Sequence, residues 1–233
     1  MQSERSSHSN PLGLVAKSLG SPLEQGNLGI IMGRAGVGKT AFLTHIALEH
    51  MIQQGKNVLH VCIDELPEKI KVWYGEFLKN LAPENSSQDV AALQHRVEPM
   101  RFIMAYLHHT FTPSKLGQGI VNLKEQANFR PSLVILDGLD FDHVKRSDIE
   151  EIRSVAIHHS VALWMSARTH RHISTTNEKG VPYPCHEMDD LFDAMLFLEP
   201  EPDLVRVKIV KHGEHYHPTH AEVALNPQTY LIA

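Results

Sequence analysis

Residues 33–40 combine glycines, a lysine and a threonine at a spacing that is suited to phosphate binding. The segment reads Gly-Arg-Ala-Gly-Val-Gly-Lys-Thr and fits the pattern G-x-x-x-x-G-K-T. Glycines let the backbone fold tightly with its N–H groups pointing inward, toward an anion. In such a loop Lys39 reaches the terminal phosphates and the Thr40 hydroxyl binds Mg²⁺. We therefore predict a site for ATP and Mg²⁺, lined by Gly33, Arg34, Ala35, Gly36, Val37, Gly38, Lys39, Thr40 and Ala41.

The flanking residues supply the elements that such a loop needs. Residues 28–32 form a short apolar run that is typical of a buried strand. Residues 41–54 have their apolar side chains on one side, which predicts a helix whose N-terminus adds partial positive charge at the phosphates. A glycine turn that only connects a strand to a helix is the alternative. The full spacing, with both flanking elements present, disfavours it.

Asp137 is the candidate second metal ligand, because it follows four consecutive aliphatic residues at 133–136. P-loop enzymes use an acidic residue at the end of a core strand to organise Mg²⁺, usually through water. The alternative is a simple turn at the end of the strand. The next residue is Gly138 rather than glutamate. This disfavours families that place a water-activating glutamate beside the metal-binding aspartate.

Asp64 and Glu65 are the candidate acids for the attack of water, since they directly follow the predicted strand 58–63. The carboxyl ends of parallel strands line the ligand crevice, where one acid can orient or deprotonate water. The alternative is that they stabilise the start of the next predicted helix, 68–81, which Pro67 opens. Different members of the pair can hold the two roles. Together with Lys39, the two acids form the candidate catalytic set.

The remaining pattern predicts one α/β domain. Strand–helix–strand units predict parallel strands with right-handed crossovers, and the last strands predict antiparallel pairs. We expect a mostly parallel central sheet, flanked by helices and completed by antiparallel strands. The further predicted helices are 91–97, 114–128 and 148–159; the further strands are 101–107, 133–136, 161–165, 194–198, 205–210 and 215–225, with a turn at 213–214 and a polar loop at 83–89.

The composition is that of a globular protein with one large domain. The chain has 233 residues, of which 42% are hydrophobic and 21% charged. Residues 1–17 are expected to be a flexible arm and residues 18–233 a single domain. The net charge of −5 argues against a surface devoted to nucleic acid, and no apolar run is as long as a membrane span. Cys62 and Cys185 have neither disulfide-framework nor zinc spacing, so we expect a cytoplasmic protein.

These motifs together resemble the RecA superfamily of P-loop ATPases, and most closely its KaiC-like members, with a core of the KaiC, RadA and DnaB type. The resemblance covers about residues 18–225 and rests on the loop and five further segments: 20–26, 58–70, 133–138, 161–166 and 205–213. It implies a RecA-like fold, ATP hydrolysis, and catalytic carboxylates at Asp64 and Glu65. It also implies self-association into a ring, expected to be a hexamer, with nucleotide between subunits.

The resemblance further implies a role for Lys211. In the family, a basic residue of the closing strand reaches the γ-phosphate held by the neighbouring subunit. The family usually shows Lys-x-Arg-Gly there, whereas this chain has Lys211-His212-Gly213. One expected base is therefore absent or replaced by His212, and a slow ATPase is expected.

Weaker signals concern partners and metals. The loop 167–187 contains basic residues and Tyr183, and its equivalents in ring-forming relatives contact DNA or a protein; an ordinary solvated loop is the alternative. Ser166 and Thr169 are, by analogy, candidates to sense the γ-phosphate. The chain has 17 histidines, and a run of four is either a metal site or simple surface: His212, His215, His217 and His220.

The leading hypothesis is an oligomeric, ATP-hydrolysing regulator or DNA-associated motor. A catalytically weak, ATP-dependent binding or sensor module is the second hypothesis, because the Lys211-His212-Gly213 end departs from the family. A small-molecule P-loop kinase is the third. It is disfavoured because the chain ends in a β-rich segment and shows no arginine-rich lid helix.

Overall fold

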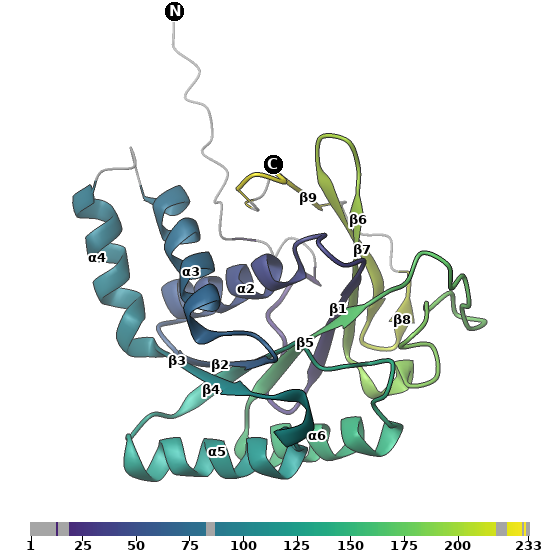
Figure 1. Ribbon diagram of the computed structural model, residues 1–233, viewed down its shortest axis with the longest axis horizontal. Coiled ribbons are helices and arrows are strands. Elements are labelled where there is room, and N and C mark those ends of the chain that lie inside the picture. The colour runs from purple at the N-terminus through teal and green to yellow at the C-terminus, as the bar shows by residue number, and fades with distance from the viewer. Residues whose placement is uncertain (1–12, 14–18, 83–86, 218–222, 230, 232–233) are drawn as a thin grey trace, which may run out of the picture.

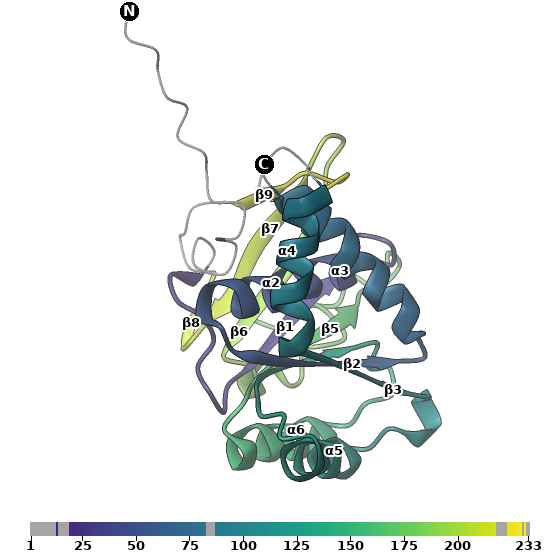
Figure 2. The same cartoon turned by 90° about the vertical axis from the view of Figure 1, so that its left-hand side faces the viewer.

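Two layers of helices enclose a central sheet in the computed structural model of the chain (Figure 1), which describes residues 13, 19–82, 87–217, 223–229 and 231. The expected arm, except residue 13, lies outside the described residues. In Figure 1 one layer of helices lies above the sheet and the other below it, and Figure 2 shows the same two layers after a quarter turn. The helices above are α2 (Lys39–Gln54), α3 (Pro67–Leu81) and α4 (Ser87–Val97); those below are α5 (Pro113–Gln126) and α6 (Arg146–His159).

The described residues form a nine-stranded sheet in the order β3-β2-β4-β5-β1-β6-β7-β8, with β9 also paired with β7. The strands from β3 to β6 in this order are parallel, and β7 is antiparallel to β6, β8 and β9. The expected mostly parallel sheet with antiparallel strands at its end is confirmed. The strand bounds are β1 Leu28–Gly33, β2 Asn57–Ile63, β3 Arg101–Tyr106, β4 Pro131–Asp137, β5 Ala162–Arg168, β6 Ala194–Pro200, β7 Val205–His212, β8 His215–Tyr216 and β9 Val223–Leu225.

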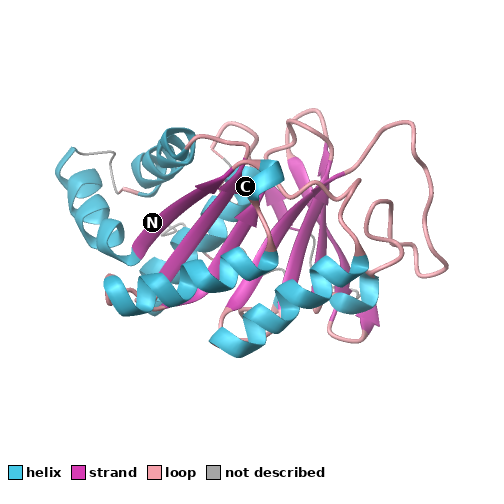
Figure 3. Cartoon of the chain, turned by 60° about the horizontal axis from the view of Figure 1, so that its bottom comes forward, coloured by secondary structure: helices cyan, strands magenta, loops and turns pink. Residues whose placement is uncertain are grey.

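The core lies on both faces of this sheet, which explains the continuous apolar runs in the sequence. All six residues of β1 are buried. Ile31 packs with Phe42 and Trp164 on the side of α2, while its neighbour Ile30 packs with Ile152 on the side of α6. Figure 3 looks onto the face that α5 and α6 cover, with the strands running side by side behind them. A parallel strand that is covered on both faces has no wet side and therefore shows no alternation.

Because the parallel strands run in one direction, their last residues share one edge of the sheet, which we call the carboxyl edge. Register places Gly33 of β1 beside Arg168 of β5, and Asp137 of β4 beside Cys62 of β2. The loops after these strands therefore meet in space although they are far apart in sequence. None of the described helices is both long enough and apolar enough to cross a membrane.

Two expectations about local structure were wrong. A polar loop was expected at 83–89, but α4 begins at Ser87. Asp89 lies in the first turn of this helix, where its negative charge is favourable. The single strand expected at 215–225 is two short strands, β8 and β9, which pair with different parts of β7. His217 follows β8 with a φ of 47°, a left-handed backbone that ends the strand.

Two histidines are held in environments that exclude the charged form. His60 of β2 is fully buried, and its Nδ1 lies 3.1 Å from the hydroxyl oxygen of Tyr74. Burial lowers the pKa of His60 to about 4. Burial, with a smaller effect of Lys56, also lowers the pKa of His50 in α2 to about 4. Both rings are therefore neutral near pH 7.

We expect the free energy of unfolding to decrease as the pH falls from about 6.5 toward 4. In this window the unfolded chain, with a histidine pKa of about 6.5, binds protons that the folded chain does not bind. His60 alone accounts for up to about 3 kcal/mol. Urea unfolding at several pH values measures the effect. His60→Phe should flatten the pH dependence and the exposed control His95→Gln should not; an unchanged slope in His60→Phe would contradict the assignment.

Candidate functional site

The glycine loop has a backbone suited to holding an anion. Gly36 and Gly38 have φ values of 76° and 98°, a left-handed conformation that glycine adopts without strain. A Cβ at Gly33 would lie 2.8 Å from Val37 Cγ1 and 3.1 Å from the carbonyl oxygen of Leu198, so a side chain there would force Val37 to move and would crowd the backbone of β6. No side-chain hydrogen bond caps α2 at Gly38. The N–H groups of its first turn, which have no partner within the helix, are thus oriented for an anion.

Lys39 lies beneath this loop. Its Nζ donates hydrogen bonds to the carbonyl oxygens of Gly33 and Arg34, each at 2.9 Å. Burial lowers the pKa of Lys39 to about 8; Asp137 opposes this shift and the charge of Arg168 adds to it. Partial removal from water destabilises the charged ammonium of Lys39, and a bound anion would stabilise that charge.

Asp137 is the centre of a hydrogen-bonded group that links three elements. The Thr40 hydroxyl donates to Asp137 Oδ2 at 2.6 Å, and the Ser166 hydroxyl donates to Asp137 Oδ1 at 2.5 Å. The carboxylate is only 9% exposed. A hydroxyl and a carboxylate in direct contact are oxygen donors of the kind that Mg²⁺ prefers, so the residues present fit that ion. The structure thus brings the two candidate metal ligands, Thr40 and Asp137, into direct contact.

The two candidate acids lie on the same edge but make different contacts. Asp64 has a φ of 56°, and its Oδ1 accepts a hydrogen bond from the backbone N–H of His108 at 2.7 Å. It therefore ties the end of β2 to the residues after β3. Glu65 forms an ion pair with Lys69, one turn into α3, and its Oε1 accepts from the backbone N–H of Leu66 at 3.3 Å. Both contacts are with residues at the start of α3, and neither is with the glycine loop.

The position after Asp137, which Gly138 occupies, has no room for a glutamate side chain. Its φ is 96°, and a Cβ at this position would lie 2.4 Å from the carbonyl oxygen of Ile63. The ends of β2 and β4 therefore approach too closely for any side chain at position 138. Ile63, directly before Asp64, therefore lies against Gly138, directly after Asp137.

Lys211 does not lie at the glycine loop of its own chain. It is only 4% exposed, and its Nζ donates to the carbonyl oxygen of Asp189 at 3.0 Å. Through Met195 of β6 it is in register with Ile30 in the middle of β1. Burial lowers its pKa. To reach a phosphate on a neighbouring chain, this ammonium would have to leave a buried contact.

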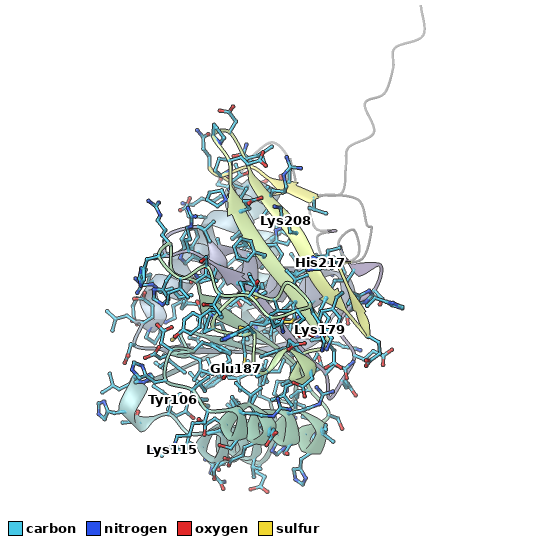
Figure 4. All side chains as sticks on the ribbon, turned by 90° about the vertical axis from the view of Figure 1, so that its right-hand side faces the viewer. Tyr106, Lys115, Lys179, Glu187, Lys208 and His217 are labelled. Atoms are coloured by element: carbon cyan, nitrogen blue, oxygen red, sulfur yellow. The ribbon has the colours of Figure 1, made fainter. Side chains whose placement is uncertain are left out.

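The loop 167–187 is attached to the antiparallel end of the sheet. Lys179 pairs with Asp189 at 3.0 Å and donates to the Tyr216 hydroxyl at 3.1 Å, and its carbonyl oxygen lies 2.9 Å from His217 Nε2. Figure 4 shows Lys179 and His217 together on this side of the molecule. The charge of Lys179 is therefore already compensated.

The run of histidines does not form a metal site in the part of the chain that the structure describes. No three His, Cys, Asp or Glu side chains among the described residues are arranged to hold a metal ion. His220, the last member of the run, lies outside the described residues. His217 contacts the backbone of Lys179, as above.

Sequence reasoning missed the role of Ser166 as a partner of Asp137. It had been a candidate for sensing phosphate, but its hydroxyl donates to the Asp137 carboxylate and accepts from the backbone N–H of Gly138 at 3.3 Å. The available signal was its position: a polar residue, 4% exposed, in an apolar strand that lies between β4 and β1. A buried hydroxyl needs a partner, and Asp137 was the nearest candidate.

Comparison with known proteins adds no family. The sequence matches no protein-family model, and it has no significant match among curated proteins.

We expect Gly138→Ala to destabilise the fold by about 2 to 4 kcal/mol, because it adds both backbone strain and a clash with Ile63. The matched control is Gly75→Ala in α3, where a Cβ meets nothing within 4 Å. That change should stabilise the protein by about 0.5 to 1 kcal/mol. Chemical unfolding of the two variants measures both effects, and equal stabilities would contradict the close approach of β2 and β4.

Proposed function

We propose that the chain binds ATP with Mg²⁺ and hydrolyses it, as a RecA-like protein of the KaiC type. One observation carries the proposal: the 2.6 Å hydrogen bond between Thr40 and Asp137, residues that are 97 positions apart in sequence. It joins the glycine loop to the acidic end of a second strand. A structural turn between a strand and a helix has no need of this contact, whereas a metal–phosphate site needs both groups together.

Each residue then has a defined task. The N–H groups of the loop and of the first turn of α2 bind the phosphates, and Lys39 neutralises their charge. Thr40 and, through water, Asp137 would hold Mg²⁺, which supplies further charge neutralisation at the phosphates when bound. Ser166 fixes the orientation of the Asp137 carboxylate. Glu65, released from Lys69, would orient the attacking water.

Lys39→Ala should weaken ATP binding by roughly 100-fold or more, since it removes a half-buried, charge-assisted contact with the phosphates. The control is Lys79→Ala, which removes an exposed lysine that pairs with Glu76 on α3. Calorimetric titration with ATP and Mg²⁺ measures both variants. Retained affinity in Lys39→Ala would overturn the proposed site.

A second function, an ATP-dependent binding module with scarcely any turnover, is favoured by the contacts of two residues. Glu65 is paired with Lys69, and Lys211 is buried against Asp189. In this arrangement neither group is directed to a phosphate. The nucleotide would then act as a ligand that stabilises the carboxyl edge rather than as a substrate.

Glu65→Gln separates the two functions. If Glu65 orients water, the variant should bind ATP normally but hydrolyse it roughly 100-fold more slowly, the usual scale of general-base catalysis. Glu76→Gln, which changes an exposed acid on the same helix, should hydrolyse ATP at the wild-type rate. Phosphate release under saturating ATP is the measurement. An appreciable wild-type rate that Glu65→Gln leaves unchanged would refute the role of Glu65, and a negligible wild-type rate supports the binding module.

The resemblance leads us to include three further points in the proposal. The chain would act in the cytoplasm, as a regulatory ATPase or a DNA-associated motor. Copies of the chain would self-associate into a ring, with nucleotide at the subunit interfaces. The loop 167–187 would face a DNA or protein partner.

A further inference from the structure

Arg168 is the last residue of β5 and lies beside the start of the glycine loop. It is in register with Gly33, the last residue of β1. The pairing continues one residue further, because the N–H of Thr169 donates to the carbonyl oxygen of Gly33 at 3.1 Å. The backbone of Arg168 is therefore held next to the loop, on the same edge as Lys39 and Thr40.

The side chain of Arg168 belongs to the face of the sheet that α2 covers. Alternate residues of a strand share a face, so Trp164, Ser166 and Arg168 point to the same side. Trp164 packs in the cluster that contains the apolar residues of α2. Ser166 contacts Asp137, which in turn contacts Thr40 of α2. Arg168 thus lies two residues beyond Ser166 on the same face of β5, beside the start of the glycine loop.

No described residue makes a direct ion pair with Arg168. Its side chain is exposed and forms no ion pair or hydrogen bond within the described part of the chain. Three other arginines have acidic partners: Arg146 pairs with Asp190, Arg153 with Asp193 and Arg206 with Glu201. Arg168 instead lies close enough to Lys39 for its charge to add to the lowering of the Lys39 pKa, which burial chiefly causes.

Two cations at one edge repel each other unless an anion lies between them. The carboxylate of Asp137, which accepts hydrogen bonds from Thr40 and Ser166, supplies one negative charge near Lys39. One positive charge of the two therefore remains for a ligand. A triphosphate in the loop has its inner phosphates at the N–H groups, and its terminal phosphate extends past Lys39 and Thr40, toward the Mg²⁺ ligands. That end of the ligand approaches β5. A guanidinium offers the planar donors that phosphate oxygens accept best.

We propose that Arg168 donates hydrogen bonds to the terminal phosphate of a nucleoside triphosphate bound in its own chain, so that the site distinguishes ATP from ADP. The inference rests on the proposed function and deepens it. Arg168 would supply a positive charge at the terminal phosphate from within the same subunit. Lys211 does not supply it in this structure, because its ammonium is buried against Asp189.

The test compares the affinities for ATP and ADP, each with Mg²⁺, by calorimetric titration. Arg168→Ala should weaken ATP binding by roughly 10- to 100-fold and leave ADP binding unchanged, because only ATP has the phosphate in question. Arg168→Lys, which keeps the charge but not the planar donors, should have an intermediate affinity for ATP. Arg171→Ala, an exposed arginine in the following loop, should change neither affinity.

Two outcomes would overturn the inference. ATP binding that is unchanged in Arg168→Ala excludes the contact, and an equal loss of ATP and ADP affinity places Arg168 at an inner phosphate or in a structural role. Failure of the proposed function is distinguishable from both, because the wild-type chain would then bind neither nucleotide. Thermal unfolding of each variant establishes that all comparisons use folded protein.

Discussion

The geometry of the carboxyl edge depends on how a single buried carboxylate is satisfied. Asp137 is almost fully removed from water, and an isolated charge in such a place would be strongly destabilising. Two hydroxyls, from Thr40 in α2 and Ser166 in β5, donate to its two oxygens. These bonds fix β4, β5 and the first turn of α2 relative to one another. This arrangement therefore also sets the positions of the segments that adjoin it: the glycine loop, the start of α2 and the end of β5 with Arg168.

The elements around this group could be predicted because they are buried on both sides. A strand covered by helices on both faces must be apolar throughout, so β1, β2 and β4 are visible in the sequence as unbroken apolar runs. Helix α2 is bounded by two glycines, Gly38 and Gly55, with φ values of 98° and 64°. The strand–loop–helix unit, the parallel sheet and the meeting of Thr40 with Asp137 therefore followed from local pattern and from the direction of the strands.

What could not be predicted is the choice of partner by each polar side chain. Glu65 lies where its strand predicts, but it pairs with Lys69 on the next helix rather than facing the loop. Lys211 bonds to the carbonyl oxygen of Asp189, 22 positions away, in a short helix that carried no sequence signal. Such contacts depend on loop conformations far apart in the chain, and hydrophobic periodicity contains no information about them. The start of α4 was missed for a related reason, because polar residues favour loops and helix starts alike.

The contact between Gly138 and Ile63 also limits how this chain can change by mutation. Any residue with a Cβ at position 138 would have to separate two hydrogen-bonded strands and change a left-handed backbone at the same time. An acidic residue placed beside Asp137 by substitution of Gly138 would therefore carry both penalties. Any further carboxylate at this edge would therefore have to come from another strand end or loop, because the backbone of Ile63 occupies the space that a side chain at position 138 would need.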